Sequence, residues 1–375
     1  MTERISRYLR EQQPETPCLV VDLDVVENNY RRMRELLPAA HIFYAVKANP
    51  ADKVLARLGG LGSKFDTASR GEIELVQAAG VAVDRISFGN TIKKEKDIAW
   101  AYQQGVRLFA FDSEAELQKL ARVAPGARVF CRVLVDCGGA EWPLSKKFGC
   151  APEMAKDLLR RAKESGLDAY GVSFHVGSQQ KDPTQWDTAL RTTAEMFRDL
   201  EALGITLSMV NLGGGFATRY RTDVPEAELY GMAILDSLRQ HFGNRLPETI
   251  VEPGRSMVGN AGVIQSEVVL ISRKSANDNR RWVYLDIGKF GGLAETMDEA
   301  IQYPIVTPRN GDTEGVILAG PTCDSADVMY EKADYQLPLD LRIGDLVHIH
   351  AAGAYTTTYA SVNFNGFSPL SQYYI

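Results

Sequence analysis

Short apolar runs alternate with amphipathic stretches of helix length over most of this chain, and this alternation constrains the fold more than any other feature. After Pro17, β-branched and aromatic residues gather in eight runs. Segments such as 69–80 and 113–123 have helical spacing instead, with Ser69 and Ser113 as N-caps. Eight βα repeats predict a (β/α)8 barrel of the TIM type within the α/β class. The predicted strands are residues 41–48, 64–69, 85–90, 108–113, 127–136, 170–178, 207–216 and 249–255.

A doubly wound sheet is the alternative for a βα pattern, but it predicts a glycine-rich nucleotide fingerprint after an early strand. The chain contains neither GxGxxG nor GxxxxGK[ST]. From about residue 257 the pattern changes to strand-like runs without long helices, at 263–274, 281–288, 315–320 and 345–352, which predicts a C-terminal, mostly antiparallel β domain. We therefore expect a barrel over residues 24–256 and a β domain formed by 1–23 and 257–375, with CLVVDLD as an extra strand.

Composition excludes several classes of function. The net charge of -6 argues against nucleic acid or an anionic membrane surface as the main partner. The N-terminal residues lack the apolar core of a signal peptide, and no stretch is long enough to span a bilayer, so a cytoplasmic location is expected. The five cysteines form no CxxC pair and predict reduced thiols.

Polar and glycine residues stand at the ends of the predicted strands. In a (β/α)8 barrel these ends meet at one mouth, where the chemistry of such enzymes is carried out. A single lysine after an apolar run is usually a surface residue, but so many polar strand ends together favour a site. The strand-end residues are Lys47, Asp66, Asn90, Arg132, His175, Gly213 to Gly215 and Glu252 to Arg255.

An amine, an anion cradle and an acid at one barrel mouth indicate pyridoxal 5'-phosphate (PLP). Gly213, Gly214 and Gly215 expose backbone N–H groups that suit a phosphate, although a plain flexible turn is the alternative. Lys47 would be the Schiff-base amine and Glu252 the acid at the pyridine nitrogen. His175 would stack on the ring, unless it is an ordinary core histidine. His348 and His350 share a strand face but have no third ligand motif nearby, so we expect no metal.

Seven motifs carry a resemblance to a known family: FYAVKAN, FDTASRGE, SFHVGSQ, NLGGGF, EPGRS, GPTCDSAD and GAYT, in that order. The chain resembles the fold-type III PLP-dependent decarboxylases, most closely the bacterial ornithine and lysine/ornithine decarboxylases. The resemblance implies that Lys47 binds the cofactor, Glu252 pairs with the pyridinium and His175 stacks on the ring. It further implies that Asp66, Glu72 and Arg132 line the site, and that the phosphate is held by Ser178, Gly215, Gly254, Arg255 and Tyr355.

The resemblance also implies how substrate is handled. Cys323 would return a proton to the substrate and Asp324 would bind the distal ammonium, both across a homodimer with shared active sites. From the residues alone, the Gly320–Pro321 break before Cys323 favours exposure, but a generic cysteine is more often a small buried hydrophobe. Asp324 fits a helix N-terminal carboxylate equally well. The acidic segment 286–300 departs from the longer eukaryotic ornithine decarboxylases and offers Glu295, Asp298 and Glu299 as further candidates for the distal amine.

The predicted reaction is decarboxylation of L-ornithine, and of L-lysine as a second substrate, to putrescine or cadaverine and CO2 in polyamine biosynthesis. Three alternatives stay open: a diaminopimelate decarboxylase, a racemase of the same fold, and a catalytically inactive regulatory homologue. The acid Glu252 favours a decarboxylase over a racemase, which typically places arginine at the pyridine nitrogen.

Overall fold

The computed structural model describes residues 1–135, 138, 140–142 and 147–375 and divides the chain into two compact units. The barrel unit comprises residues 27–217 and 224–254. The β unit comprises residues 1–26, 218–223 and 255–375. Each unit is thus assembled from separate pieces of the sequence.

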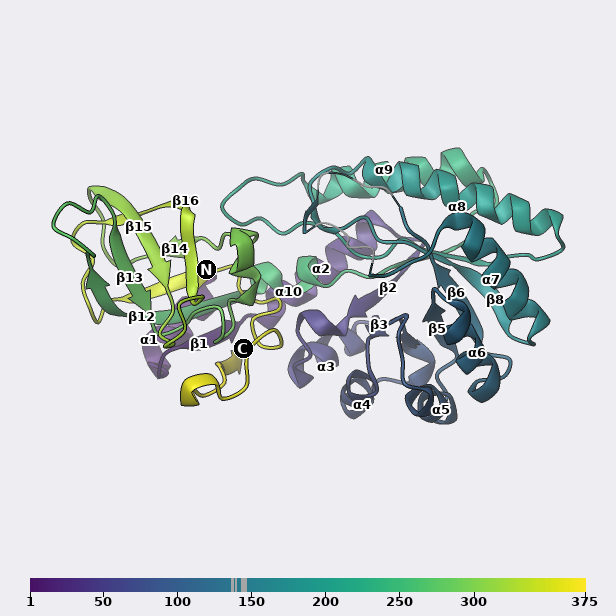
Figure 1. The fold of residues 1–375 in the computed structure, drawn as a ribbon, viewed down its shortest axis with the longest axis horizontal. Helices are drawn as coiled ribbons and strands as arrows, with labels where there is room; N and C mark the ends of the chain where they lie inside the picture. Colours follow the sequence, from purple (N-terminus) through teal and green to yellow (C-terminus); the bar gives the residue numbers. More distant parts are fainter. Residues whose placement is uncertain (136–137, 139, 143–146) are drawn as a thin grey trace. The chain divides into compact units, whose positions relative to one another are not determined.

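Eight parallel strands close the barrel in the order β10-β11-β2-β3-β4-β5-β6-β8, with helices outside them (Figure 1). Each of the eight predicted segments overlaps one of these strands, which confirms the predicted barrel. The strands are β2 (Ala40–Ala45), β3 (Lys64–Thr67), β4 (Ile86–Phe88), β5 (Leu108–Phe111), β6 (Arg128–Arg132), β8 (Asp168–Ser173), β10 (Met209–Asn211) and β11 (Glu248–Val251). Inside the barrel, five strands contribute a buried cluster: Phe43, Ala110, Phe130, Met209 and Ile250.

The helices of the barrel follow the strands as the capping signals predict. Ser69 accepts a hydrogen bond from the N–H of Glu72, and Ser113 accepts one from the N–H of Glu116, so both predicted N-caps are confirmed. The helices are α2 (Leu23–Leu36), α3 (Asp52–Gly60), α4 (Arg70–Ala78), α5 (Glu95–Gln104), α6 (Glu114–Val123), α7 (Pro152–Glu164), α8 (Gln185–Ala202) and α9 (Ala227–Phe242). A small ribbon of β7 (Ala140–Trp142) and β9 (Ser178–Gln180) adds to this unit.

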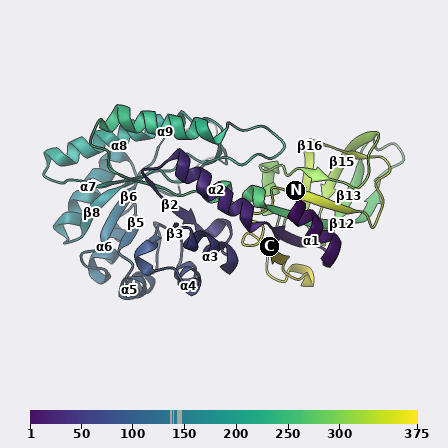
Figure 2. The ribbon, with the colours of Figure 1, turned by 180° about the vertical axis from the view of Figure 1, so that it is seen from behind.

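The β unit is an eight-stranded sheet in which most pairs are antiparallel, as predicted; β13–β15 and β1–β18 are parallel. CLVVDLD supplies the expected extra strand, because β1 pairs with β12 (Figure 1). Figure 2 shows strands β12, β13, β15 and β16 of this unit from behind. The sequence patterns missed the long strand β16. The strands are β1 (Cys18–Val21), β12 (Gly262–Ser272), β13 (Arg281–Leu285), β14 (Ile305–Val306), β15 (Thr313–Ala319), β16 (Val328–Pro338), β17 (Leu346–His350) and β18 (Ser371–Tyr374).

Two helices belong to the β unit. Helix α1 (Glu3–Gln12) begins at the cap Thr2 and buries Ile5 and Leu9 against strand β1 and Val263. Helix α10 (Arg255–Val258) is a single turn. In the part of the chain that the structure describes, no helix has both the length and the apolarity needed to cross a bilayer.

The described cysteines are free thiols: Cys18, Cys131 and Cys150 are buried, and Cys323 is exposed. The fifth, Cys137, lies outside the described residues.

Candidate active site

Lys47 projects from the end of strand β2. The strand passes into a short 3-10 turn, Val46–Ala48, in which Val46 and Ala48 are buried and Lys47 between them is exposed. The N–H of Ala45 donates to the carbonyl of Pro253 (3.1 Å), which joins the exits of β2 and β11. The apolar run therefore anchors the base of a lysine whose side chain extends from the barrel mouth.

The three glycines after β10 form a tightly packed turn rather than a loose one. A methyl group on Gly213 would lie 2.5 Å from the carbonyl oxygen of Phe174 and 3.2 Å from the Cα of His175. One on Gly214 would lie 2.6 Å from the carbonyl oxygen of Glu252. Gly213 also has φ of +64°, a conformation that favours glycine. The structure thus brings the turn against both His175 and Glu252.

His175 is a neutral imidazole in this setting. Burial, together with the nearby cations of Arg132 and Lys47, lowers the pKa of His175 to about 3. Its Nδ1 accepts a hydrogen bond from the N–H of Gly177 (3.0 Å), which fixes the ring. A neutral ring that is held in place suits stacking on a cationic aromatic group, because it does not repel the charge.

Glu252 directly follows strand β11 and is poised to gain or lose a proton near neutrality. Burial and the carboxylate of Asp66 raise the pKa of Glu252 to about 7, against the opposing effects of a hydrogen bond from Asn211 and the cations Lys47 and Arg132. A cationic ring nitrogen beside Glu252 would favour the charged carboxylate. The acid has the chemistry that a pyridinium partner requires.

Asp66 and Arg132 complete the charged groups of the mouth. Burial raises the pKa of Asp66, and Lys47, a hydrogen bond from Ser87 and Arg132 oppose that rise. Burial lowers the pKa of Arg132, while the carboxylates of Glu252, Asp112 and Asp66 oppose this. The predicted residues Lys47, Asp66, Arg132, His175 and Glu252 therefore act on one another electrostatically.

Three more predicted residues belong to the barrel unit: Glu72 in the first turn of α4, Ser178 in β9 and Gly254 after β11. The carboxylate of Glu72 accepts a hydrogen bond from the N–H of Ala68 (2.7 Å), so it ties helix α4 to the end of β3. Ser178 is the first residue of β9, three residues after His175. Gly254 is the last residue of the barrel unit.

Sequence reasoning missed two residues that shape this mouth. The Asp66 carboxylate packs directly against Gly89, which follows β4. A methyl group on Gly89 would lie 1.8 Å from Asp66 Oδ1. Asn211, the last residue of β10, donates from Nδ2 to Glu252 Oε1. The predicted strands 85–90 and 207–216 ran past both residues, so their position at the observed strand ends gave no signal in the sequence.

Other predicted site residues lie in the β unit, where Arg255 has a partner that was not predicted. Its Nη1 and Nη2 donate to the two carboxylate oxygens of Glu295 (2.7 and 2.6 Å), and Nη1 also donates to the hydroxyl of Tyr220 (2.8 Å). Arg255 and Glu295 are both buried, and the ring of Tyr355 lies 4.8 Å from the guanidinium. Glu295, a candidate for the substrate's distal amine, has its carboxylate bound by Arg255 in this structure.

The other two acidic candidates for the distal amine, Glu299 and Asp298, have different surroundings. Glu299 accepts hydrogen bonds from three successive backbone N–H groups, at Glu331, Lys332 and Ala333. Asp298 is exposed. Of the three candidates, two are therefore held by the β unit itself.

Cys323 and Asp324 occupy an exposed loop after strand β15. The interpretation of Cys323 as a small buried hydrophobe is therefore wrong. The N–H of Cys323 donates to Asn365 Oδ1 (2.8 Å), and Asp324 accepts from the N–H of Ala326 (2.8 Å). The buried Asp327 holds the loop by accepting from the N–H and the hydroxyl of Thr322.

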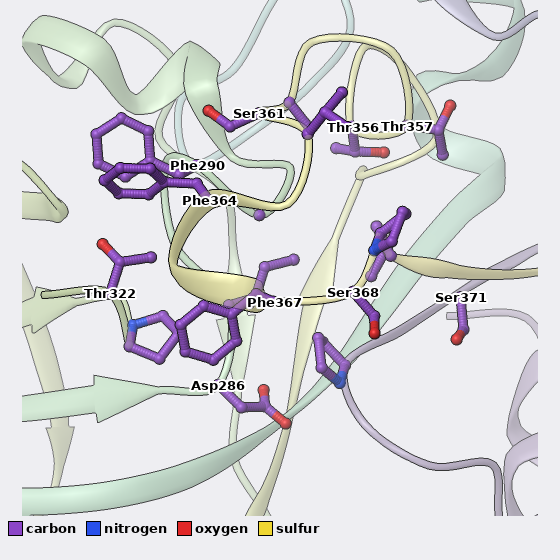
Figure 3. Close-up of a pocket in the computed structure, with 18 of the residues that line it drawn as sticks. Asp286, Phe290, Thr322, Thr356, Thr357, Ser361, Phe364, Phe367, Ser368 and Ser371 are labelled. Atoms are coloured by element: carbon purple, nitrogen blue, oxygen red, sulfur yellow. The ribbon is translucent and has the colours of Figure 1, made fainter. Parts of the chain in front are cut away.

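The same loop borders a cavity of about 530 Å³ within the β unit. Figure 3 shows Thr322 at this cavity, with Phe290 and Phe364 packed against each other (ring centroids 4.8 Å apart) and Phe367 nearby. The cavity thus lies beside the residues that precede Cys323.

The histidines of β17 are held by packing and hydrogen bonding. His348 Nε2 lies 3.1 Å from Gln265 Oε1, and burial lowers the pKa of both His348 and His350, the latter to about 4. Among the residues that the structure describes, no cluster of three or more acidic, histidine or cysteine side chains could hold a metal ion.

The residues of the barrel mouth fit the chemical needs of PLP. The cofactor requires an amine for its aldehyde, N–H donors for its phosphate, an acid at its ring nitrogen and a flat face for its ring. Lys47, the turn Gly213–Gly215, Glu252 and His175 match these four needs in that order, and His175 and Glu252 pack directly against the turn.

Comparison with known proteins agrees with this chemistry. Residues 23–259 match the family model described as pyridoxal-dependent decarboxylase, pyridoxal binding domain. A lysine/ornithine decarboxylase from Selenomonas ruminantium is 37% identical over 98% of this chain and 91% of its own length. Crystal structures of SrLDC with PLP and cadaverine, and of the Vibrio vulnificus lysine/ornithine decarboxylase with cadaverine, are similar to this fold. Their TM-scores are 0.88 and 0.89, at 33% and 31% identity, and the matches cover 99% of this chain and 93% and 97% of those chains.

The family match covers the whole barrel, and the full-length relatives extend it over the β unit. The chain therefore belongs to the pyridoxal-dependent decarboxylases, as an enzyme with pyridoxal 5'-phosphate as its cofactor.

Proposed function

We propose that this enzyme decarboxylates L-ornithine and L-lysine, giving putrescine and cadaverine with release of CO2, as a step in polyamine biosynthesis. The observation that carries the proposal is the turn Gly213–Gly215 packed against His175 and the acid Glu252, with Lys47 close enough to shift the pKa of both. Relatives named for lysine and ornithine, and structural neighbours with bound cadaverine or putrescine, support the substrate class. The free thiols favour the cytoplasm as the compartment.

The barrel residues divide the work of holding the cofactor. PLP, when bound, supplies a protonated ring that accepts the electron pair left behind by CO2. In our proposal Lys47 binds the aldehyde, and the glycine turn binds the phosphate through the N–H groups of Gly214 and Gly215, since the N–H of Gly213 donates to Asn211 Oδ1. Glu252 keeps the ring nitrogen protonated, and the neutral ring of His175 supports the ring face. Asp66, Glu72 and Arg132 set the charge around the reacting atoms.

The remaining steps fall to the β unit. Loss of CO2 leaves an electron pair at Cα that must receive one proton, and we propose Cys323 as the donor. Asp324, next to it, would bind the distal ammonium that distinguishes a diamino acid. Both side chains are exposed in the single chain, and we propose that they complete the site of a second copy, so that the enzyme works as a homodimer. Ser178, Gly254, Arg255 and Tyr355 remain our proposed phosphate contacts.

Discrimination between ornithine and lysine is expected to be weak. The two substrates differ by one methylene, which a pocket distinguishes by only about 1–3 kcal/mol. The binding of the Glu295 carboxylate to Arg255 removes one acid that would have added selectivity for chain length.

A catalytically inactive homologue is the second candidate, since antizyme inhibitor 2 from Xenopus laevis is 32% identical over the whole of this chain and 84% of its own length. Against it stand Lys47, Asp66 and Cys323, the amine, the acid and the thiol that the reaction needs.

A product assay tests the proposal. The purified protein with added PLP would be given L-ornithine, L-lysine, L-arginine and diaminopimelate in separate reactions, and CO2 and amines would be measured. We expect putrescine from ornithine and cadaverine from lysine. Preferential turnover of diaminopimelate or arginine would overturn the substrate assignment, and interconversion of enantiomers without CO2 would indicate a racemase.

A spectroscopic control separates an inactive homologue from a wrong substrate. Covalently bound PLP gives a visible absorption band, and the Lys47→Ala variant should lose it. If the wild-type protein shows no band and no turnover, the regulatory alternative is correct. If the band persists in the variant, the assignment of Lys47 is wrong.

A further inference from the structure

Asn211 occupies the junction between the acid and the glycine turn. It is the last residue of β10, which lies between β8 and β11 in the barrel, and its side chain is buried. Its Nδ2 donates to Glu252 Oε1 (2.5 Å), and its Oδ1 accepts from the N–H of Gly213 (2.9 Å). One amide group therefore contacts both parts of the cofactor site.

We propose that Asn211 is a positioning residue for PLP: its amide fixes the carboxylate of Glu252 at a set distance from the phosphate-binding turn. The inference rests on the proposed roles of Glu252 and of the glycine turn. A backbone hydrogen bond also links Glu252 to the turn, since the N–H of Glu252 donates to the carbonyl of Gly213 (2.8 Å). The side-chain bridge adds a second connection, and this one reaches the reacting carboxylate.

The orientation of the amide follows from its neighbours. A backbone N–H can only donate, so the group of Asn211 that meets Gly213 must be the oxygen, and the NH2 must face Glu252. An amide supplies this donor without adding charge. A carboxylate here would place a further negative group beside the acids that already interact, Glu252 and Asp66. The neutral side chain therefore stabilises the ionised form of Glu252.

The substitution Asn211→Asp removes one of the two bonds. An aspartate keeps the size and the oxygen that accepts from Gly213, but it donates to Glu252 only while it is protonated. The titratable groups at the ends of the two neighbouring strands are Glu252, after β11, and the neutral His175, after β8. The charged groups that act on Glu252 there are Asp66, Lys47 and Arg132.

The test is a titration of the cofactor-free protein with PLP across a range of pH, with affinity taken from visible absorption or tryptophan fluorescence. We expect the affinity of Asn211→Asp, divided by that of the wild type, to be near one at low pH. Above the pKa of the introduced acid the ratio should fall by about tenfold per pH unit. As a matched control, Asn244→Asp adds the same charge at an exposed position of the barrel unit, and its ratio should stay near one.

A second variant keeps the test decisive. Asn211→Leu removes both bonds and should weaken PLP binding at every pH without the new pH dependence. A flat ratio for Asn211→Asp would overturn the positioning role even if the wild type binds PLP normally. Failure of the wild type to bind PLP would instead overturn the proposed cofactor site and, with it, this inference.

Discussion

Replacement of Gly89 by alanine tests how the barrel holds Asp66. The added methyl group would lie 1.8 Å from Asp66 Oδ1 and 2.9 Å from its Cγ. A carbon and an oxygen that are not bonded normally stay about 3.3 Å apart, so the carboxylate must move by about 1.5 Å. Asp66 is buried, which leaves it little room, and we expect overpacking to cost about 1–3 kcal/mol of the free energy of unfolding.

Chemical denaturation of the cofactor-free protein measures this cost, and a double-mutant cycle assigns it. In the Asp66→Ala background the carboxylate is gone, so Gly89→Ala should cost almost nothing. The two sites should therefore show a coupling energy of about 1–3 kcal/mol. The control is Gly71→Ala in helix α4, where the nearest atom to the new methyl group is 3.8 Å away. Alanine there should stabilise the helix by about 0.5–1 kcal/mol.

The reasoning is refuted if Gly89→Ala costs the same free energy with and without the Asp66 carboxylate. An unchanged stability of the single variant would refute it too, because no rearrangement would then be required. The same variant also reports on the site. A misplacement of about 1 Å near reacting groups lowers turnover by about a hundredfold, so diamine formation should fall far more than stability alone explains.

Three further predictions concern the proposed shared site of the dimer, the buried ion pair of Glu116 and the titration of Glu252. Mixing the Lys47→Ala and Cys323→Ala variants should restore about a quarter of wild-type activity, because half of the randomly formed dimers carry one complete site of two; no gain on mixing would contradict shared sites. Glu116→Gln should lower the free energy of unfolding by about 3 kcal/mol, because Glu116 neutralises the buried Lys93 (3.0 Å). As a control, Glu74→Gln removes an exposed ion pair with Arg70 and should cost under about 1 kcal/mol. In the cofactor-free protein the raised pKa of Glu252, about 7 when folded against about 4.3 when unfolded, stabilises the folded state at low pH, and this advantage is lost as pH rises through 7. The wild type should therefore lose free energy of unfolding relative to Glu252→Gln between about pH 4 and 7, and a constant difference would show that the carboxyl does not titrate there.

The barrel was predictable because every strand carries its own local signal. The runs of β-branched and aromatic residues are largely buried, and the helices after β3 and β5 carry the readable N-caps Ser69 and Ser113. Strand ends were less accurate: residues 170–178 were predicted as one strand, but β8 ends at Ser173 and His175 begins the functional loop. Strand β16 was missed because Glu331, Lys332 and Asp334 interrupt its apolar pattern.

Partners of site residues were harder to predict because they depend on contacts between distant residues. Asn211 and Glu252 are 41 positions apart, and Arg255 and Glu295 are 40 apart. No local pattern indicates that an arginine will engage an acid expected to bind substrate. Lys47, His175, Glu252 and the glycine turn were identifiable because their strand-end positions already implied a common mouth.

The pairing of β1 with β12 sets an order of events for the nascent chain. Residues Cys18–Val21 are entirely buried in the folded protein, yet their partners run from Gly262 to Gln265. At a synthesis rate of roughly 5–20 residues per second, this apolar segment waits for tens of seconds before its neighbour leaves the ribosome. A barrel can form in the meantime, whereas β1 cannot pair until residues 262–265 have left the ribosome. Interruption of synthesis after the barrel would therefore leave CLVV uncovered, as a natural target for chaperones.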